Sequence, residues 1–328
     1  MDPDALADWC VRWLGAPPAA ELFATGNLSA VQGLRLADGR EVVVKVRPSL
    51  PRLAGCAVVH RALWRAGYPC PEPLVGLQPL NGYAASAEVL VADAGEPPGG
   101  ELAAASATAL SAPALSAAAL SAAGLARLVE LAPSPGSVPS LSPSPSWVGW
   151  DHAEPGLWPG PEDRDVDLNA YPERQWLGRV ATAVRQRLRA FASDPVIGHG
   201  DWWPGNLRWL GSELHAVYDW DSVIGQPEPA MAGFAAVSFR GIDGPGPLAS
   251  VDDSAAFLDA YQQARGCSWT PRDCAAFWAA GLWQRAFDAK TQSLDGDPEQ
   301  ILTRHEARDR LHRAGLNPDL VSSAGAAH

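Results

Sequence analysis

Several side chains that can do chemistry crowd into residues 197–222. Alternating apolar residues flank a turn at 211–213, a pattern that predicts a β-hairpin. If the turn centres on its last two residues, Asn206 lies opposite Asp219 at the open end, with Cβ atoms about 5 Å apart. Asp201 stands five residues before Asn206, in a loop closed by a Pro-Gly pair. The spacing therefore predicts a cluster of carboxylate and amide oxygens beside one hairpin.

These residue types suit a phosphoryl-transfer site. Mg²⁺ takes few protein oxygens and completes its shell with phosphates and water, so we expect Asn206 and Asp219 to hold Mg²⁺. From its loop, Asp201 can accept the proton of a hydroxyl that attacks a phosphoryl group, as a general base does. Asp221 has three open interpretations, namely support of the metal ligands, contact with the acceptor, or a solvated surface acid.

A lysine in a strand-like segment adds a cation to this set. Only Lys45 and Lys290 are lysines among the 25 basic residues, and Lys45 lies within Glu41–Arg47, where valines alternate. If the valine face is the core, Lys45 projects into a cleft. An ammonium is a compact charge suited to a phosphate in a narrow site, so we expect Lys45 to bind the α- and β-phosphates of the phosphoryl donor. The alternative is an ordinary lysine on an exposed strand.

The motif His199-Gly-Asp201-x-x-x-x-Asn206, followed by a strand that ends at Asp219, resembles a known catalytic signature. It is similar to that of the aminoglycoside phosphotransferase/choline kinase superfamily, small-molecule kinases with a protein-kinase-like fold. The resemblance implies that Asp201 is the catalytic base and that Asn206 and Asp219 bind Mg²⁺. It also implies that Lys45 contacts the ATP phosphates and that His199 supports the loop without doing chemistry.

The resemblance implies an α+β fold of two lobes, a small antiparallel β-sheet lobe and a mainly helical lobe. We expect residues 1–92 to form the nucleotide-binding lobe and 93–328 the helical lobe with the catalytic hairpin. Gly26 and Asn27 are expected to turn a hairpin beside the nucleotide. Within the first lobe, strands are expected at 23–31, 33–36, 40–46 and 83–91, and helices at 4–15 and 52–66.

The segment 99–146 is expected to be a low-complexity or linker tract. Its leucines recur every five residues, which places each about 140° from the last on a helix, so no single apolar face forms. A true helix is expected only around 125–131, and the Pro/Ser-rich residues 133–146 are expected to be irregular. Later helices are expected at 176–192, 254–266, 272–293 and 298–314.

Two departures from the family pattern bear on activity. The helix after Lys45 has Cys56–Val59 where relatives often carry a glutamate that pairs with the lysine, and His60 and Glu88 are the open alternatives to it. The segment 225–232 lacks the aspartate that many relatives carry there. A catalytically weak or silent nucleotide-binding protein is therefore the rival interpretation. A protein kinase proper is disfavoured because the DFG and APE motifs are absent.

Aromatic residues near the motif allow two interpretations. Trp202 and Trp203 follow the base directly, and they either shape the acceptor pocket or belong to the core, where tryptophan is more common. Trp150, Asp151 and His152 lie in a loop that can reach the acceptor. For this loop a structural role is favoured.

The composition limits the partners. Hydrophobic residues make up 47% of the 328, yet no apolar run approaches the ~20 residues of a membrane span. The opening MDPDALADWC lacks a basic region before an apolar one, and the five cysteines are scattered, so a cytoplasmic protein with reduced thiols is expected. The net charge of −12 argues against nucleic acid and suits an acidic surface or a cationic substrate. The expected partners are ATP with Mg²⁺ and a small hydroxylated acceptor (aminoglycoside, sugar or amino-alcohol), with no obligate protein partner.

Overall fold

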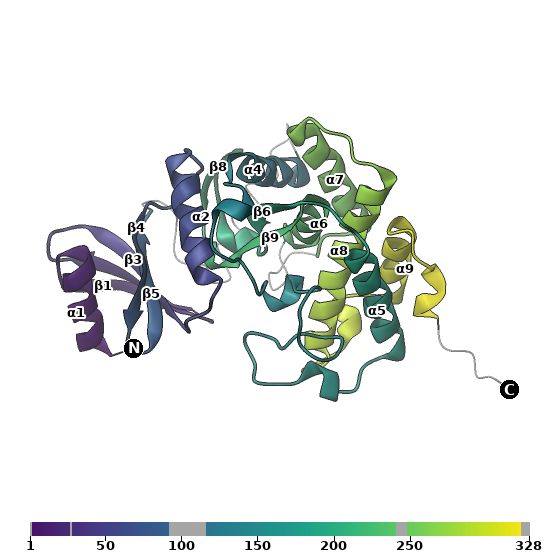
Figure 1. Ribbon diagram of the computed structural model, residues 1–328, viewed down its shortest axis with the longest axis horizontal. Coiled ribbons are helices and arrows are strands. Elements are labelled where there is room, and N and C mark those ends of the chain that lie inside the picture. The colour runs from purple at the N-terminus through teal and green to yellow at the C-terminus, as the bar shows by residue number, and fades with distance from the viewer. Residues whose placement is uncertain (1, 27, 92–115, 241–247, 323–328) are drawn as a thin grey trace.

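The computed structural model describes residues 2–26, 28–91, 116–240 and 248–322. A β-sheet with a covering helix occupies one end of the elongated molecule, and helices dominate the other end (Figure 1). This mixed α+β architecture agrees with the prediction of a sheet lobe and a helical lobe. The predicted boundary between residues 92 and 93 lies outside the described residues.

Among the described residues, the sheet has five antiparallel strands in the order β1-β2-β3-β5-β4. The strands are β1 (Pro18–Thr25), β2 (Ala30–Leu36), β3 (Glu41–Arg47), β4 (Pro73–Leu80) and β5 (Tyr83–Val89), and the helices of this part are α1 (Pro3–Leu14) and α2 (Leu53–Arg65). Asp2 caps α1 by accepting a hydrogen bond from the Asp4 N–H. Gly15 ends α1 in the left-handed conformation, with φ at 83°.

The two edge strands differ from the sequence prediction. Strand β4 was not expected, because Pro73 and Pro79 lack the N–H groups that a central strand needs. Within the part of the chain that the structure describes, β4 is an edge strand that pairs with β5 alone, so prolines are tolerated. Strand β1 begins at Pro18, whereas the prediction began it at Phe23. The earlier residues were missed because the side chains of β1 are mostly exposed and show no apolar alternation.

Strand β3 alternates as its sequence predicts. Val42, Val44 and Val46 are buried in a core that α1 shares with the sheet. Each fully buried valine contributes about 1.5–3 kcal/mol to this packing. Because successive side chains of a strand point to opposite faces, Lys45 lies on the other face, away from the α1 core.

The other end of the molecule is mainly helical. Its helices are α4 (Ala117–Leu131), α5 (Gln175–Arg189), α6 (Glu228–Ser238), α7 (Val251–Arg265), α8 (Pro271–Gln292) and α9 (Arg304–Arg313). Capping boxes at Ser250 and Thr270 begin α7 and α8. Among the described residues, none of the helices combines the length and apolarity that crossing a membrane requires.

Helix α4 corrects the prediction for the low-complexity tract. It begins well before the predicted 125–131, and Leu120, Leu125 and Leu128 are all buried in it. The prediction assumed that a stable helix must have a single apolar face. Helix α4 is buried around most of its circumference, so it can form without such a face. The part of the tract at 99–115 lies outside the described residues, and after α4 the chain is mostly irregular up to 146, as predicted.

The predicted hairpin is formed by β7 (Leu207–Leu210) and β8 (Glu213–Val217), but its register differs from the prediction. Gly211 takes a positive φ of 61°, so the turn centres one residue earlier than expected, and a bulge interrupts the pairing. The Tyr218 N–H donates to the Asn206 carbonyl over 2.9 Å. Asn206 therefore lies opposite Tyr218, and Asp219 is the next residue along.

A second antiparallel pair, β6 (Pro195–His199) with β9 (Val223–Pro227), was not predicted. Its strands are separated by the whole hairpin, so no local turn signal marks them. The pairing sets His199 opposite Val223. It therefore closes the segment 199–223 into one loop, with the predicted base near one end and the predicted metal ligand near the other.

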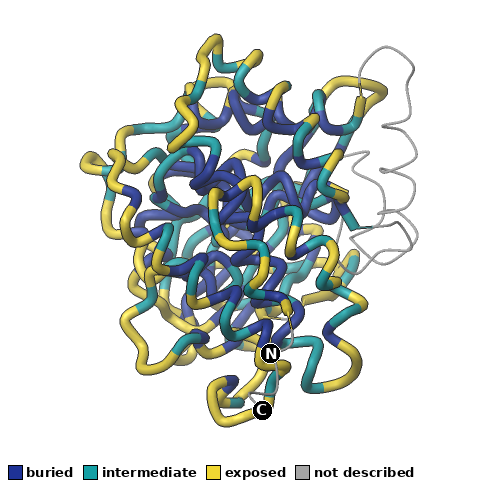
Figure 2. Tube along the Cα trace, turned by 90° about the vertical axis from the view of Figure 1, so that its right-hand side faces the viewer, coloured by how far each residue is buried: buried dark blue, intermediate teal, exposed yellow. Residues whose placement is uncertain are grey.

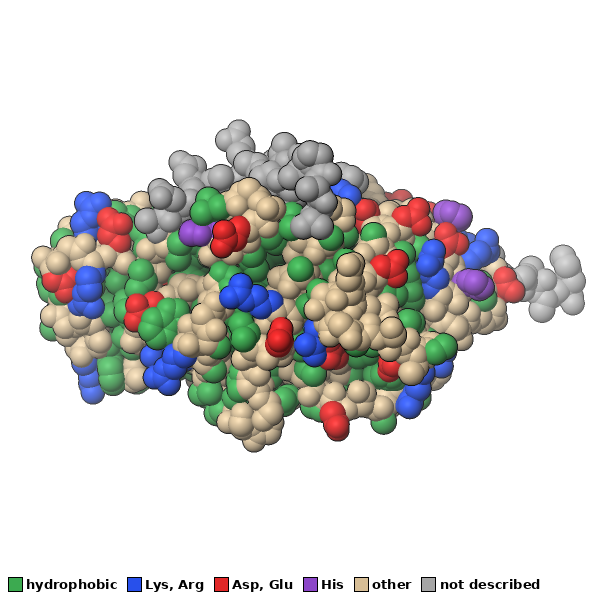
Figure 3. Space-filling view, turned by 90° about the horizontal axis from the view of Figure 1, so that it is seen from above, with side chains coloured by type: hydrophobic (Ala, Val, Ile, Leu, Met, Phe, Trp, Pro, Cys, Tyr) green, Lys and Arg blue, Asp and Glu red, His purple; other side chains and the backbone are tan. Residues whose placement is uncertain are grey.

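Two apolar cores support the site. One joins α1 to the sheet, and the larger one fills the helical part (dark blue in Figure 2). Helix α2 contributes Cys56, Val59 and Leu63 to the larger core, although it follows β3 in sequence. Helix α2 therefore fixes the sheet against the helical part. On the face seen in Figure 3, acidic and basic side chains are interspersed.

Candidate active site

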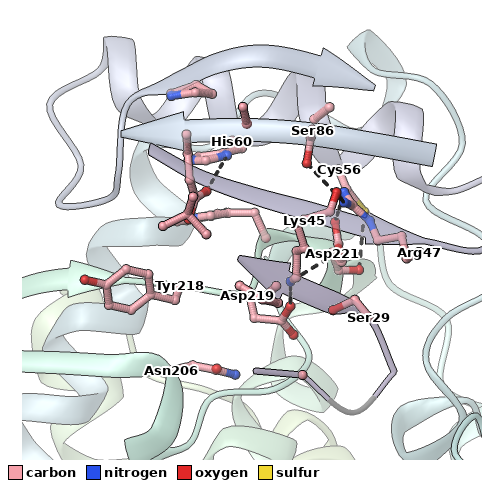
Figure 4. Close-up of a pocket in the computed structure, with 18 of the residues that line it drawn as sticks. Ser29, Lys45, Arg47, Cys56, His60, Ser86, Asn206, Tyr218, Asp219 and Asp221 are labelled. Atoms are coloured by element: carbon pink, nitrogen blue, oxygen red, sulfur yellow. Dashed lines mark hydrogen bonds and ion pairs between the residues drawn. The ribbon is translucent and has the colours of Figure 1, made fainter. Parts of the chain in front are cut away.

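Lys45 faces the helical part and pairs with two aspartates. Its Nζ donates to Oδ1 of Asp219 and lies 3.2 Å from Oδ2 of Asp221 (Figure 4). Burial opposes the charge, but the two carboxylates raise the pKa of Lys45 above its usual value. With its side chain only 21% exposed, Lys45 is a charged group between the sheet and the helical part and not a solvated surface lysine.

Asp219 is held in an unusual backbone conformation just after β8. Its φ is 59°, in the left-handed region that side-chain-bearing residues seldom adopt. The Ser222 hydroxyl donates to Oδ2 over 2.6 Å. Burial opposes ionisation, but Lys45 and these hydrogen bonds hold the pKa of Asp219 below its usual range. The site therefore presents an ionised carboxylate in a fixed orientation.

Asp201 and Asn206 meet in the loop between β6 and β7. The Asn206 Nδ2 donates to Oδ2 of Asp201 over 2.7 Å and to its carbonyl over 3.0 Å, and the Trp203 Nε1 donates to the same Oδ2 over 3.1 Å. Burial, with the negative charge of Asp219, raises the pKa of Asp201 to about 7. This carboxylate can therefore gain or lose a proton near neutral pH.

His199 fixes the start of this loop. Its Nδ1 accepts from the Asp201 N–H over 3.2 Å, so its Nε2 is the protonated nitrogen, which donates to the Tyr218 carbonyl over 3.0 Å. Burial lowers the pKa of His199, which keeps the ring neutral. His199 thus links the base loop to the end of the hairpin, a contact that fits the supporting role implied by the family resemblance.

Two cavities meet at Asp201. The first, of about 550 Å³, is lined by Lys45, Asn206 and Asp219 among others. The second, of about 410 Å³, lies against the helical part and includes Phe287. Asp201 and Trp203 line both. Asp201 therefore forms part of the wall of both cavities.

Gly26 lines the first cavity at the end of β1. Its φ is +130°, and a Cβ there would lie 1.7 Å from the Ser29 carbonyl oxygen, so only glycine fits. The chain can thus turn tightly beside the cavity. Asn27, predicted to act with Gly26, lies outside the described residues.

The donor set suits a hard cation supplied together with phosphates. Asn206 donates through its nitrogen to Asp201, which leaves its amide oxygen as the acceptor atom, and Asp219 is an ionised carboxylate lining the same cavity. Among residues 2–26, 28–91, 116–240 and 248–322 there is no group of three or more His, Cys, Asp or Glu placed to hold a metal alone. One carboxylate and one amide are nevertheless enough for Mg²⁺, which keeps water and phosphate ligands.

Neither alternative to the missing glutamate pairs with the lysine. Glu88 instead lies 4.0 Å from His60, whose Nε2 donates to a backbone carbonyl. Burial raises the pKa of Glu88 to about 7 and lowers that of His60 to about 4. Cys56 on α2 points its Sγ at the Asp221 carbonyl, 3.5 Å away. The carboxylates that pair with Lys45 come from the loop after β8.

Trp202 is a core residue. It is 0% exposed, its Nε1 donates to the Ser121 hydroxyl of α4 over 2.8 Å, and its ring meets that of His199 at 6.0 Å between centroids. Because Trp202 is fully buried, it cannot contact an acceptor, and its contacts instead support the loop of Asp201. Its neighbour Trp203 instead lines both cavities.

The loop with Trp150, Asp151 and His152 makes hydrogen bonds to the helical part, which fit the structural role that the sequence favoured. Arg185 of α5 donates to the carbonyls of Trp150 and His152, each over 2.8 Å. Asp151 accepts from Gln226 over 3.2 Å. These contacts fasten the loop to the helical core.

Several residues of the site were not singled out from the sequence. Arg47, Ser222, Glu162 and Asp288 line a cavity or hold a residue that does. Alternation along β3 places Arg47 beside Lys45, which was a usable signal. Glu162 and Asp288 come from separate segments that only the tertiary fold joins, so no local pattern marks them.

The sequence matches the model of the phosphotransferase enzyme family over residues 20–278, which is most of the chain. The chain belongs to this family. It is a small-molecule kinase that phosphorylates an alcohol group, as predicted. No protein with a curated description matches the sequence.

Solved structures share the fold at low identity. Spectinomycin phosphotransferase in complex with ADP and spectinomycin is 13% identical, with a TM-score of 0.56 over 98% of this chain and 97% of that one. Amicoumacin kinase with AMP-PNP and Ca²⁺ is 9% identical, with a TM-score of 0.62 over 94% and 93%. An aminoglycoside-3'-phosphotransferase of type VIII is 20% identical, with a TM-score of 0.50 over 87% and 98%. The fold is therefore the predicted two-lobed protein-kinase-like one.

Proposed function

We propose that the protein transfers the γ-phosphoryl group of ATP to a hydroxyl of a small acceptor in a Mg²⁺-dependent reaction. The observation that carries the proposal is that Asp201 lines both cavities. A nucleotide in the first cavity and an acceptor in the second would meet at this carboxylate. Membership of the phosphotransferase family supports the same reaction.

The first cavity offers groups for each part of the nucleotide complex. Lys45 would contact the phosphates, and Asn206 and Asp219 would hold Mg²⁺. Gly26 would lie along the phosphates, where the lack of a side chain leaves room for them. When bound, Mg²⁺ supplies positive charge that neutralises the charge developing on the transferred group.

Asp201 would act as the general base. It accepts the proton of the acceptor hydroxyl as that oxygen bonds to the γ-phosphorus and the bond from phosphorus to the ADP oxygen breaks. The products are a phosphate monoester and ADP, with the proton on Asp201. A pKa of about 7 lets the carboxylate take up this proton and release it to water at neutral pH.

The second cavity favours an acceptor that carries an amine. Among the described residues that line it, Glu162, Asp163 and Asp288 are acidic and one, Arg164, is basic. Arg164 is already paired with Asp163 and Asp295, so the cavity keeps a negative balance. Acidic groups attract a cationic substrate and orient it. We therefore favour an aminoglycoside or amino-alcohol over a neutral sugar.

The aromatic walls of the second cavity support the same choice. Trp147, Trp203 and Phe287 line it beside the acids. The faces of aromatic rings attract ammonium groups at about 0.5–2 kcal/mol each. A compact amine-bearing ring or chain would meet both kinds of group there.

A screen for acceptor-dependent ADP formation tests the proposal. Purified protein with Mg²⁺ and ATP is offered aminoglycosides, amino-alcohols and neutral sugars, with Asp201→Asn as the matched control. We expect ADP to form with amine-bearing acceptors and the rate to fall ~10²- to 10⁴-fold in Asp201→Asn, as for loss of a general base. A silent nucleotide-binding protein would instead be stabilised by Mg²⁺ and ATP while no acceptor raises ADP formation.

A further inference from the structure

Lys45 is shared between two carboxylates, one of which has a second task. Its Nζ donates to Asp219 Oδ1 and lies 3.2 Å from Asp221 Oδ2. Under the proposed function Asp219 holds Mg²⁺, and a divalent cation at that carboxylate repels the ammonium. Lys45 therefore needs another anchor when metal and nucleotide bind.

The contacts of Asp221 suit it to hold Lys45 in place of Asp219. Its Oδ2 faces Lys45, while its Oδ1 accepts from Arg47 Nη2 over 2.6 Å. Arg47 is only 7% exposed and also donates through Nη1 to the Ser86 hydroxyl over 3.0 Å and to the Lys45 carbonyl over 3.1 Å. Because Arg47 is fixed on three sides, it holds the Asp221 carboxylate beside the lysine (Figure 4).

Helix α2 leaves this task to Asp221. Cys56 stands in the segment where relatives often have the lysine-pairing glutamate, and its Sγ contacts the carbonyls of Asp221 and Val223 at 3.5 and 3.9 Å. Burial raises the pKa of the Cys56 thiol to about 12, so the side chain is neutral. The helix thus packs against the backbone of the Asp221 loop and brings no charge to the lysine.

We propose that Asp221, held by Arg47, is the positioning residue that orients Lys45 toward the nucleotide phosphates once Asp219 is engaged by the metal. The inference rests on the proposed function. Asp221 acts through Lys45 and does not itself contact the reacting atoms. It takes the place of the glutamate that the helix lacks.

A double-mutant cycle separates this role from a structural one. Binding of AMP-PNP with Mg²⁺ is measured by calorimetry, and kcat and KM are measured for ATP and acceptor. Asp221→Asn should weaken nucleotide binding and lower kcat/KM for ATP by about tenfold or more, the effect of losing a charged hydrogen bond. The acceptor KM should not change. In a Lys45→Ala background the same substitution should cost nothing further, because its effect passes through the lysine.

Two more variants complete the test. Glu41, on the same strand as Lys45, forms an exposed pair with Arg35 of β2, and Glu41→Gln should break this pair and change neither binding nor rates. If Asp221→Asn does not fold, Arg47→Gln serves instead, with a smaller loss that again disappears in the Lys45→Ala background. Equal losses with and without Lys45 overturn the proposal. Failure of the proposed function looks different, because the unmodified protein would then bind no Mg²⁺–AMP-PNP or show no acceptor-dependent turnover.

Discussion

Asp201→Asn should stabilise the ligand-free protein while it lowers turnover ~10²- to 10⁴-fold. In the free protein Asn206 and Trp203 both donate to the same oxygen of Asp201. The single amide oxygen of an asparagine can accept both bonds, so the substitution keeps the loop and removes only the charge. The charge is unfavourable there, because burial and Asp219 raise the pKa of Asp201 to about 7.

The size of the effect follows from this pKa. The folded protein binds the Asp201 proton at about 7, whereas the ordinary value is 3.8, a difference of about 3 pH units. Because the folded state holds the proton more tightly, stability falls as pH rises from about 4 to 7, by at most about 4 kcal/mol. Solvent in the cavities reduces this cost, so we expect Asp201→Asn to gain about 1–3 kcal/mol at pH 8, or several degrees in Tm.

Thermal melts without nucleotide or metal, at pH 5, 6, 7 and 8, measure this gain. The Tm of Asp201→Asn should exceed that of the unmodified protein by an amount that grows from pH 5 to pH 8. Glu213→Gln removes a charge from the exposed first residue of β8 in the same hairpin and is the matched control, with no such trend. A variant less stable at pH 8, or a difference independent of pH, would refute the account of Asp201 as a half-buried carboxylate whose charge is unfavourable in the folded protein.

Three other predictions address the remaining groups. Lys45→Arg should melt normally without ligand yet lose most ATP-dependent turnover, because the wider guanidinium misplaces the phosphates; full activity would exclude the phosphate role. Asn206→Ala and Asp219→Ala should each weaken Mg²⁺-dependent nucleotide binding, Asp219→Ala more because it loses a charge, and an unchanged Mg²⁺ requirement in both would put the metal elsewhere. Glu162→Gln and Asp288→Asn should raise the KM of an amine-bearing acceptor several-fold and leave the ATP KM unchanged; unaltered acceptor KM values would speak against the acidic cavity as the acceptor site.

The parts of the site that the sequence predicts are those that short-range patterns fix. His199, Asp201 and Asn206 belong to one loop, so their spacing alone brings them together. The orientation of Lys45 followed from the alternation of valines along β3. The valines occupy the buried face of the strand, so Lys45 must lie on the other face.

What the sequence does not predict depends on contacts between distant segments. The β6–β9 pairing joins segments on either side of the hairpin, so no local pattern indicates it. The prolines of β4 argue against a strand in the sequence, but they are tolerated because β4 lies at the edge of the sheet. The predicted register of the hairpin was wrong by one residue. The bulge and the positive φ of Gly211 depend on packing, which the alternation of apolar residues does not reveal. The partners of Lys45 could not be chosen from the sequence, since Asp221 lies 176 residues further along and meets it only in the folded protein.

The most direct test of the central claim is to follow the γ-phosphorus of ATP by ³¹P NMR in the presence of protein, Mg²⁺ and the best amine-bearing acceptor. We predict a phosphate monoester resonance that grows in equal amount with ADP. Inorganic phosphate as the sole product, or no loss of ATP with any hydroxylated acceptor, would contradict phosphoryl transfer at the junction of the two cavities.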